Sequence, residues 1–342
     1  MPNPRIIALD TANPTTSFTQ EELLAIASYT DERRRGFFLH SGIEQRHMYV
    51  DKATFRPTET TDELNARFRE GGVEIGRLAI QRALDQAGCS AQEIDFVVTT
   101  TCTGRLCPNL DAYFVREFRM KERVQRVHVG DMGCASGMIA LQQAYNHLLA
   151  FPDHRALIVS VEICSSTYYL DDSLETAVAN AIFADGSAAA ILASDGDAGV
   201  EVLGHMSLVR SEYLDLMGFT YPDGRPRILL SKEIRGIGSA MMKGLAAAML
   251  DHYHLKQEEI RFWVLHSAGR GVLERTQHAM GLTDADLQFS RQVLRRFGNM
   301  SSATVLFVLN EVIRSGQASP GDLGVMIALG PGFCAEGALL RW

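Results

Sequence analysis

The feature that most constrains the fold is a turn-and-helix sequence that the 342-residue chain contains twice. "VGDMGCASGMIALQQAY" (129–145) is matched far downstream by "FGNMSSATVLFVLNEV" (297–312). The first copy carries Cys134 where the second carries Ser302, and Asn299 replaces an aspartate of the first copy. The spacing is far too long for a solenoid repeat, so the pattern predicts two similar halves.

The segments around the two copies also repeat in the same order. Each half has a predicted helix, then a predicted strand, then the repeated turn, then a second apolar strand. The paired segments are 71–88 with 236–253, 95–101 with 262–268, and 156–163 with 324–330. We interpret the chain as an ancient duplication, with an N-terminal half at 1–200 and a C-terminal half at 201–342 packed as one globule.

Near-continuous apolar runs alternate with segments of helical periodicity, which predicts an α/β fold with sheets covered by helices on both faces. The predicted strands are 5–10, 95–101, 156–163, 187–194, 262–268, 324–330 and 337–342. The predicted helices 71–88 and 236–253 have apolar residues at spacings of three and four.

Composition and charge exclude several classes of protein. With 46% hydrophobic residues and a net charge of −8, the chain can bury a large core, and its charge argues against nucleic acid or an anionic membrane as the main partner. No apolar run approaches 18 residues and the start has no signal pattern, which predicts a cytoplasmic protein. The six cysteines, at 89, 102, 107, 134, 164 and 334, lack disulfide-framework or metal-site spacing, so we expect no metal and no cofactor.

Cys134 is the candidate nucleophile. It follows an apolar stretch and precedes a helical pattern, so it lies at a strand-to-helix turn where free N–H groups favour a thiolate. Neighbouring glycines allow a sharp turn and close approach of a substrate. A thiolate in this setting can capture an acyl group as a thioester.

His266 and Asn299 are the candidate partners of the cysteine. His266 ends the apolar strand "FWVLH", and Asn299 lies in the turn that matches the first copy. If a pseudo-twofold relates the halves, these side chains meet Cys134 at one pocket. Their hydrogen bonds suit a thioester oxygen that gains negative charge, as in the enolate left when a malonyl unit loses carbon dioxide. That chemistry needs no metal.

Four motifs make the resemblance specific: "GCASG", "WVLHSAG", "FGNMSSATVLFVL" and "LGPGFCAEGALLRW". Together they resemble the type III polyketide synthases, the chalcone synthase superfamily, from about Arg5 to Trp342. The resemblance implies a thiolase-like αβαβα layered fold and a homodimer. It also implies that acyl-CoA starters are loaded on Cys134 and extended with malonyl-CoA, while His266 and Asn299 support decarboxylation and stabilise the enolate.

The same resemblance implies a set of substrate-binding residues. Phe183 matches a gatekeeping phenylalanine, Ile228 lies near the place of a second one, and Gly330, Pro331 and Gly332 match the loop of the cavity floor. Cys164 and Thr167 fall on the cavity wall, with Ser301 in the asparagine turn. Cys107 falls where one subunit typically closes the cavity of the other, and Arg46 matches a basic position near the CoA entrance.

The product and several alternatives stay open at this stage. The expected products are an alkylpyrone, a resorcinol or a related phenol. "AVANAIFADGSAA" and "FLHSGIEQRH" also resemble bacterial enzymes that make dihydroxyphenylacetyl-CoA from malonyl units alone. A ketoacyl-carrier-protein synthase shares the three candidate catalytic residue types. A non-catalytic partner subunit would usually lack the nucleophile, and a thioester hydrolase would need a carboxylate that positions water, for which the sequence shows no evident candidate.

Overall fold

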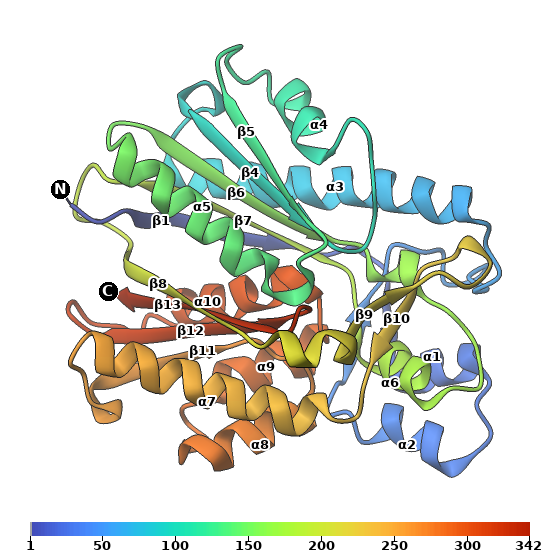
Figure 1. Ribbon diagram of the computed structural model, residues 1–342. Coiled ribbons are helices and arrows are strands. Elements are labelled where there is room, and N and C mark those ends of the chain that lie inside the picture. Colours follow the sequence, from blue (N-terminus) through green and yellow to red (C-terminus); the bar gives the residue numbers. More distant parts are fainter. Residues whose placement is uncertain (1) are drawn as a thin grey trace.

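The computed structural model describes residues 2–342 and is built on one nine-stranded mixed sheet. Its strands run in the order β11-β12-β13-β8-β1-β7-β6-β4-β5 (Figure 1). Their bounds are β1 Arg5–Ala12, β4 Phe96–Thr101, β5 Gln125–Gly130, β6 Arg155–Glu162, β7 Gly186–Ala193, β8 Val200–Val209, β11 Ile260–Leu265, β12 Leu323–Gly330 and β13 Cys334–Arg341.

The order of the strands carries the predicted internal symmetry. Outward from the centre, β1, β7, β6 and β4 occupy the places that β8, β13, β12 and β11 occupy on the other side. β1 and β8 pair only at Arg5 with Glu201 and Ile6 with Val200, so the sheet splays there into two halves. The predicted α/β fold of two related halves is confirmed. The division at residue 200 falls at the first residue of β8, and it stays a prediction.

Helices cover both halves of the sheet and also fill the space between them. α3 (Thr61–Ala87) and α4 (Leu110–Glu117) pack on the outer face of the N-terminal half. α7 (Ile234–His252) and α8 (Arg270–Met280) pack on the outer face of the C-terminal half.

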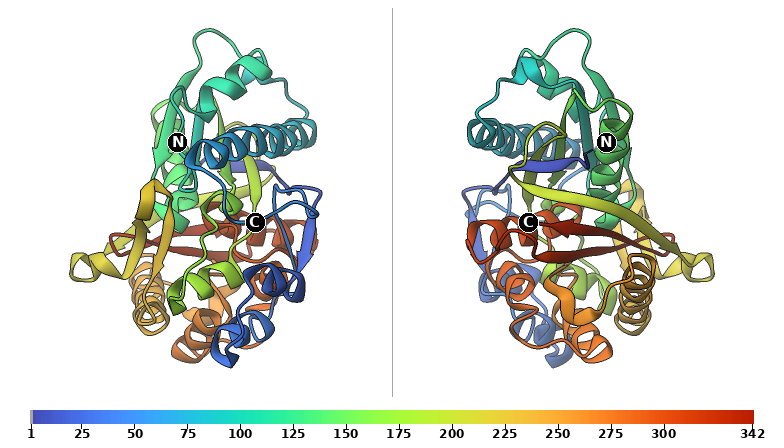
Figure 2. Two further views of the ribbon diagram at one scale, coloured as in Figure 1. Left: turned by 90° about the vertical axis from the view of Figure 1, so that its right-hand side faces the viewer. Right: turned by 90° about the vertical axis from the view of Figure 1, so that its left-hand side faces the viewer.

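The two helices of the repeated sequence lie in the middle layer. α5 (Ser136–Ala150) and α10 (Thr304–Arg314) share one core cluster with strands from both halves. The result is an αβαβα arrangement in which both repeated turns reach the centre of the molecule. Both views of Figure 2 keep α3 in the upper part and the orange and red C-terminal elements in the lower part.

Elements without a counterpart in the other half border the site. α1 (Gln20–Ala27), α2 (Glu32–Leu39) and α6 (Leu174–Ile182) form a small cluster beside the C-terminal half (Figure 1). A separate hairpin of β9 (Met217–Thr220) and β10 (Arg227–Leu230) lies next to them. The other elements are β2 (Ser17–Thr19), β3 (Gln45–His47) and α9 (Gln288–Phe297).

The predicted elements all occur, with different ends. α3 begins ten residues before the predicted start of 71, because Thr60 and Glu63 form a capping box and the polar first turns face solvent. β11 ends at Leu265, so His266 lies just beyond the strand. β2, β3, β5, β8, β9 and β10 were not among the predicted strands.

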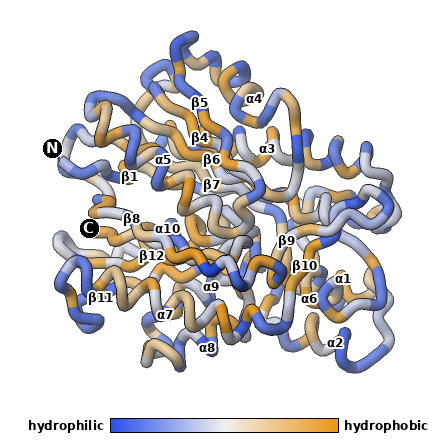
Figure 3. Tube along the Cα trace, viewed as in Figure 1, coloured by the Kyte–Doolittle hydropathy of each residue, from blue (hydrophilic) through white to orange (hydrophobic). Residues whose placement is uncertain are grey.

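Hydrophobic segments follow the inner strands, and hydrophilic segments follow the peripheral turns (Figure 3). Within residues 2–342, none of the helices is long and apolar enough to cross a membrane.

Candidate active site

Cys134 lies in a sharp turn between β5 and α5. The turn contains two left-handed residues, Asp131 (φ 58°) and Gly133 (φ 57°), followed by a single 3₁₀ turn at Gly133–Ala135. A Cβ at Gly133 would lie 2.3 Å from Cδ of Pro331, so both the backbone angle and the packing require glycine. The cysteine is 7% exposed, which places the thiol at the inner end of a pocket.

The second turn packs directly against the first. It runs from Gly298 through Asn299 to a 3₁₀ turn at Ser301–Ala303, which opens α10. A Cβ at Gly137 of α5 would lie 2.3 Å from the carbonyl oxygen of Ser302. The two copies of the repeated sequence are therefore in backbone contact, as the pseudo-twofold predicted.

A chain of hydrogen bonds joins the second turn to the cysteine. The Ser301 hydroxyl donates to Sγ of Cys134 at 3.4 Å, and Sγ of Cys102 lies 3.0 Å from the same hydroxyl. Because Ser301 has one hydroxyl proton, the Cys102 thiol is the donor in the second contact. Negative charge on the Cys134 sulfur would thus be stabilised from one side.

The Asn299 side chain is held by its oxygen. Oδ1 accepts hydrogen bonds from the Ser301 N–H at 2.9 Å and the Thr304 hydroxyl at 3.2 Å. The Nδ2 group donates to the Ala268 carbonyl at 3.3 Å. One N–H of Nδ2 has no protein partner in the described chain, and this donor can serve a ligand oxygen.

His266 follows β11 and is fully buried. Neither ring nitrogen has a hydrogen-bond partner among residues 2–342, and burial lowers the pKa of the imidazole to about 3. The ring is therefore neutral near pH 7. Buried, unpartnered polar atoms of this kind are costly, and a substrate oxygen would satisfy them.

Phe183 is fixed beside Asn299 through the backbone. The Asn299 N–H donates to the Ile182 carbonyl at 2.8 Å, and the Ala184 N–H donates to the Asn299 carbonyl at 2.9 Å. These two bonds form a parallel bridge between segments that lie far apart in the sequence. The backbones of the predicted gatekeeping residue and of the predicted catalytic asparagine are therefore held side by side.

A pocket of about 230 Å³ leads to Cys134. Six of the predicted residues line it: Cys134, Cys164, Phe183, Ile228, Ser301 and Pro331. The β9–β10 hairpin supplies much of the remaining wall, through Met217, Gly218, Phe219, Tyr221 and Leu230. The far rim is formed by Arg105 and Asp131, which form an ion pair at 3.2 Å.

Comparison with known families matches most of the chain to two models. Residues 18–211 match the family described as FAE1/Type III polyketide synthase-like protein, and residues 229–342 match the C-terminal domain of chalcone and stilbene synthases. The chain belongs to the type III polyketide synthases. Members of this family are acyltransferases.

Curated relatives of this polyketide synthase extend over its whole length. The 3,5-dihydroxyphenylacetyl-CoA synthase of Streptomyces toyocaensis is 32% identical, over 100% of this chain and 90% of the relative. The 1,3,6,8-tetrahydroxynaphthalene synthase of Streptomyces peucetius subsp. caesius is 33% identical, over 98% of this chain and 93% of the relative.

Solved structures agree with the fold of this polyketide synthase. PKS-I of the brown alga Ectocarpus siliculosus has a TM-score of 0.92 at 29% identity, covering 100% of this chain and 98% of its own. The tetrahydroxynaphthalene synthase of Streptomyces coelicolor has a TM-score of 0.92 at 26% identity, with 99% of each chain covered.

Burial opposes the thiolate that was expected at Cys134 of this polyketide synthase. Burial raises the pKa of the thiol to about 12, and the Glu162 carboxylate raises it further, while the Ser301 hydrogen bond lowers it. The free N–H groups of the turn and the helix end favour a thiolate, whereas loss of solvent around the sulfur favours the neutral thiol.

The expected position of Arg46 at a CoA entrance is wrong. The side chain is fully buried, Nε donates to Oε1 of Gln20 at 3.1 Å, and Nη1 donates to the Phe183 carbonyl at 2.6 Å. A guanidinium enclosed in this way cannot reach phosphates at the surface. Its observed contacts anchor the segment that carries Phe183.

The other predicted residues do not line this pocket, and these include His266 and Asn299, which were expected to meet Cys134 there. Thr167 is buried, and its hydroxyl donates to the Cys164 carbonyl at 2.8 Å. Gly330 packs against Ala135 behind the cysteine turn, and Gly332 has a left-handed φ of 116°. Cys107 is exposed, two residues beyond Arg105 of the pocket rim. Their roles toward substrate stay predictions.

Two residues near the site were missed from the sequence. Cys102 lines the pocket and contacts Ser301. Glu162, at the end of β6, is fully buried and accepts hydrogen bonds from the Cys102 N–H, the Thr103 hydroxyl and the Ser302 hydroxyl. A carboxylate at the end of the apolar run "ALIVSVE" was the available signal, since strand ends in α/β folds gather functional groups.

Proposed function

We propose that the chain builds polyketides on Cys134 by repeated decarboxylative condensation with malonyl-CoA. The observation that carries this proposal is the contact of Cys134 with the Ser301 hydroxyl, which itself adjoins the oriented amide of Asn299, at the base of a buried pocket. A thiol, an amide donor and a neutral imidazole suit acyl capture followed by enolate formation.

In the loading step, the Cys134 sulfur attacks the thioester carbonyl of the starter. The new carbon–sulfur bond forms as the bond to the CoA sulfur breaks. His266, whose ring nitrogens have no partner within residues 2–342, accepts the thiol proton as the carbon–sulfur bond forms and passes it to the CoA sulfur as that sulfur leaves. Burial disfavours charge on both the thiol and the imidazole, so the proton moves together with the attack of the sulfur and not before it.

In the extension step, malonyl-CoA loses carbon dioxide and leaves an enolate. The free N–H of Asn299 and a ring N–H of His266 donate to the enolate oxygen. The enolate carbon then attacks the Cys134 thioester, the new carbon–carbon bond forms, and the Cys134 sulfur leaves with the Ser301 hydroxyl as its donor. Loss of water around the malonyl carboxylate in the pocket favours its departure as neutral carbon dioxide.

The size of the pocket supports one kind of starter over another. In the first candidate reaction, which we call the leading one, an acyl-CoA starter is extended and cyclised to an alkylpyrone, a resorcinol or a related phenol. A pocket of about 230 Å³ is better matched to a short chain than to a long alkyl starter. This volume, with the dihydroxyphenylacetyl-CoA synthases among the relatives, favours the second candidate, in which malonyl-CoA supplies every unit. A carrier-protein-dependent condensation is the remaining alternative.

We further propose a homodimer that closes the pocket rim. β5 is an edge strand of the sheet, and Val127 on β5 and Met132 after it are 36% and 38% exposed. An open edge with apolar side chains is a suitable surface for a second copy. Cys107 extends from the same region, so it could reach a partner's pocket.

Product analysis by mass spectrometry tests the reaction. The purified protein is given malonyl-CoA alone, and then malonyl-CoA with acyl-CoA starters from acetyl to long chain. Phenolic products from malonyl-CoA alone would support the second candidate. Products only with an added starter would support the leading one. Absence of carbon dioxide release under every condition, with activity only on malonyl attached to a carrier protein, would refute the CoA-dependent reaction.

A further inference from the structure

A small polar pocket lies where the end of β1 meets helices α3, α9 and α10. Its volume is about 300 Å³, which is at the lower end of the range for small-molecule sites. Eight of its ten lining residues are polar or charged, and the two apolar ones are Ala12 and Phe297. A ligand that fits this pocket must therefore be small and mostly polar.

Three arginines and two carboxylates line this polar pocket, and they are loosely paired. Arg296 lies 3.5 Å from Glu311, and Arg314 lies 3.9 Å from Asp10. Both distances exceed the usual N–H···O length of about 2.9 Å. Arg82 has no carboxylate oxygen within 4.0 Å among residues 2–342. The positive charges outnumber the negative ones by one, and groups of both signs remain available to a ligand.

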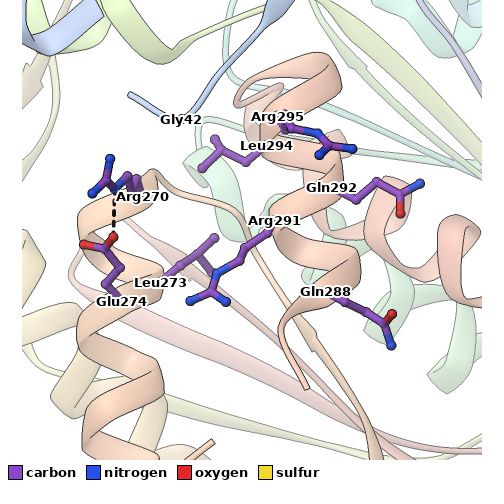
Figure 4. A pocket seen from close by; sticks show the side chains of 9 residues that line it. All are labelled: Gly42, Arg270, Leu273, Glu274, Gln288, Arg291, Gln292, Leu294 and Arg295. Carbon is purple, nitrogen blue, oxygen red and sulfur yellow. Dashed lines mark hydrogen bonds and ion pairs between the residues drawn. The ribbon is translucent and has the colours of Figure 1, made fainter. Parts of the chain in front are cut away.

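The hollow between α8 and α9 provides a contrast (Figure 4). Two of its three arginines form tight ion pairs, Arg270 with Glu274 at 2.7 Å and Arg291 with Asp284 at 2.6 Å. None of the residues that line this hollow has a buried polar side-chain atom without a partner in the described chain. Arginines gathered in a depression are therefore not enough to indicate a ligand.

The side chain of Asn310 gives the polar pocket a hydrogen-bond acceptor that has no partner. Asn310 lies on α10, lines the pocket and is only 3% exposed. Its Nδ2 group donates to the Thr11 hydroxyl at 3.5 Å, whereas no group among residues 2–342 donates to its Oδ1. Because an unsatisfied buried acceptor costs free energy, a ligand that brings a donor to this oxygen is favoured.

The charges and the acceptor together favour a small zwitterion. An ammonium group supplies several donors, which suit Oδ1 of Asn310 and the nearby Asp10 and Glu311. A carboxylate suits the guanidinium of Arg82, because the two groups match in geometry. A phosphate would pair with the arginines but would be repelled by the two carboxylates, and a metal cation would be repelled by the arginines.

We propose that this pocket binds a small free α-amino acid as its zwitterion. The carboxylate of the amino acid accepts hydrogen bonds from Arg82, its ammonium group donates to Oδ1 of Asn310, and its side chain packs on Phe297. The pocket shares no lining residue with the Cys134 pocket, so this inference does not rest on the proposed condensation reaction.

Isothermal titration of the full-length protein with each standard amino acid tests the ligand class. At least one amino acid should bind, and the corresponding acid without its amino group should bind about tenfold more weakly, because Oδ1 of Asn310 then lacks its donor. Absence of binding by every amino acid would overturn the proposal. Equal or tighter binding of the acid without the amino group, or of sodium phosphate, would overturn it as well.

Two variants test the location of the site. Arg82→Ala removes an exposed guanidinium, and Asn310→Ala removes the unpartnered acceptor; each should raise the Kd of the amino acid about tenfold. Urea unfolding should show Asn310→Ala to be at least as stable as the wild type, since a buried unsatisfied group is lost and alanine favours a helix.

Arg77→Ala, an exposed cation on the same helix as Arg82, is the matched control and should bind the amino acid as the wild type does. Arg82→Ala keeps the test independent of the buried substitution at Asn310. An unchanged Kd in both Arg82→Ala and Asn310→Ala would place the amino acid elsewhere and overturn the assignment of this pocket.

Discussion

At the scale of single residues, the site depends on which serine reaches the thiol. Alignment of the two turns places Ser302 opposite Cys134, yet the structure directs Ser302 to Glu162 and Ser301 to the thiol. Ser301 has a left-handed φ of 46°, which turns its side chain toward the first half. A pairing of sequence positions across a pseudo-twofold does not predict such a local rotation of the backbone.

Replacing Ser301 with alanine should make the thiol less reactive. The hydroxyl lowers the pKa of Cys134, so its loss leaves a smaller thiolate fraction at any pH below about 12. Peptide-level mass spectrometry after iodoacetamide treatment at pH 8 should show alkylation of Cys134 slowed several-fold. Ser194→Ala, another buried hydroxyl but one without a partner among residues 2–342, is the control. Equal rates of Cys134 alkylation in the Ser301→Ala and Ser194→Ala variants would show that the Ser301 hydroxyl does not activate the thiol.

Replacing Asn299 with aspartate should separate loading from decarboxylation. The side chain keeps its shape but loses the Nδ2 donor, so the enolate oxygen loses one hydrogen bond. Carbon dioxide release from malonyl-CoA should fall about 10²-fold, while acylation of Cys134 persists and Cys134→Ala abolishes it. Full decarboxylation by the aspartate variant would contradict the proposed role.

His205 of β8 should make stability depend on pH. Its Nε2 is buried with no partner in the described part of the chain, and burial lowers the pKa of the imidazole to about 4, below the usual 6.5. The unfolded chain binds the proton more tightly, so this contribution is complete above pH 6.5 and is lost as pH falls toward 4. Relative to His205→Phe, the wild type should lose about 1 kcal/mol per pH unit in that window, as measured by urea unfolding.

The buried carboxyl group of Asp185 changes stability with pH in the opposite direction. Burial raises its pKa to about 6, so its protonation increasingly stabilises the folded protein as pH falls below 6. Both proteins contain Asp185, and its effect cancels in their difference. A difference that stays constant between pH 6.5 and 4 would show that His205 does not titrate as proposed.

At the scale of elements, most of the sheet and its helices could be predicted because buried strands and amphipathic helices leave strong periodic patterns. The β9–β10 hairpin could not. Its strands are four residues long and only partly buried, and they pair with each other rather than with the main sheet. Their side chains form much of the pocket wall, so the shape of the pocket was the part least visible in the sequence.

Gly137→Ala should weaken the contact between α5 and the second turn. A Cβ there would meet the Ser302 carbonyl, so the helix must shift, at a cost of about 2 kcal/mol in the free energy of unfolding. Gly236→Ala in α7 is the matched control, because a Cβ there meets nothing within 4 Å. The control should be neutral or stabilising by up to about 1 kcal/mol. Chemical denaturation of both variants measures these stabilities. Equal stabilities would show that a Cβ at position 137 does not press on the Ser302 carbonyl as expected.

At the scale of the whole molecule, the two-half layout could be predicted because the turn and its flanking segments repeat in the sequence. The sequence has no comparable repeat that would predict how two copies of the chain associate.

Val127→Lys places a charge on the open β5 edge. It should convert the proposed dimer to monomers, as measured by light scattering coupled to size exclusion. Leu39→Lys, on a 45% exposed apolar residue of α2, is the control and should leave the mass unchanged. A wild-type protein of monomer mass would refute the dimer.

Glu162 has a consequence for how such a molecule can be rebuilt. It belongs to the first half, and it accepts from Cys102 and Thr103 of that half and from Ser302 of the second. A hybrid enzyme made by joining halves of two relatives would inherit the acceptor from one parent and the Ser302 donor from the other. Compatibility at this one buried carboxylate would decide whether the joined halves still form a common reaction chamber.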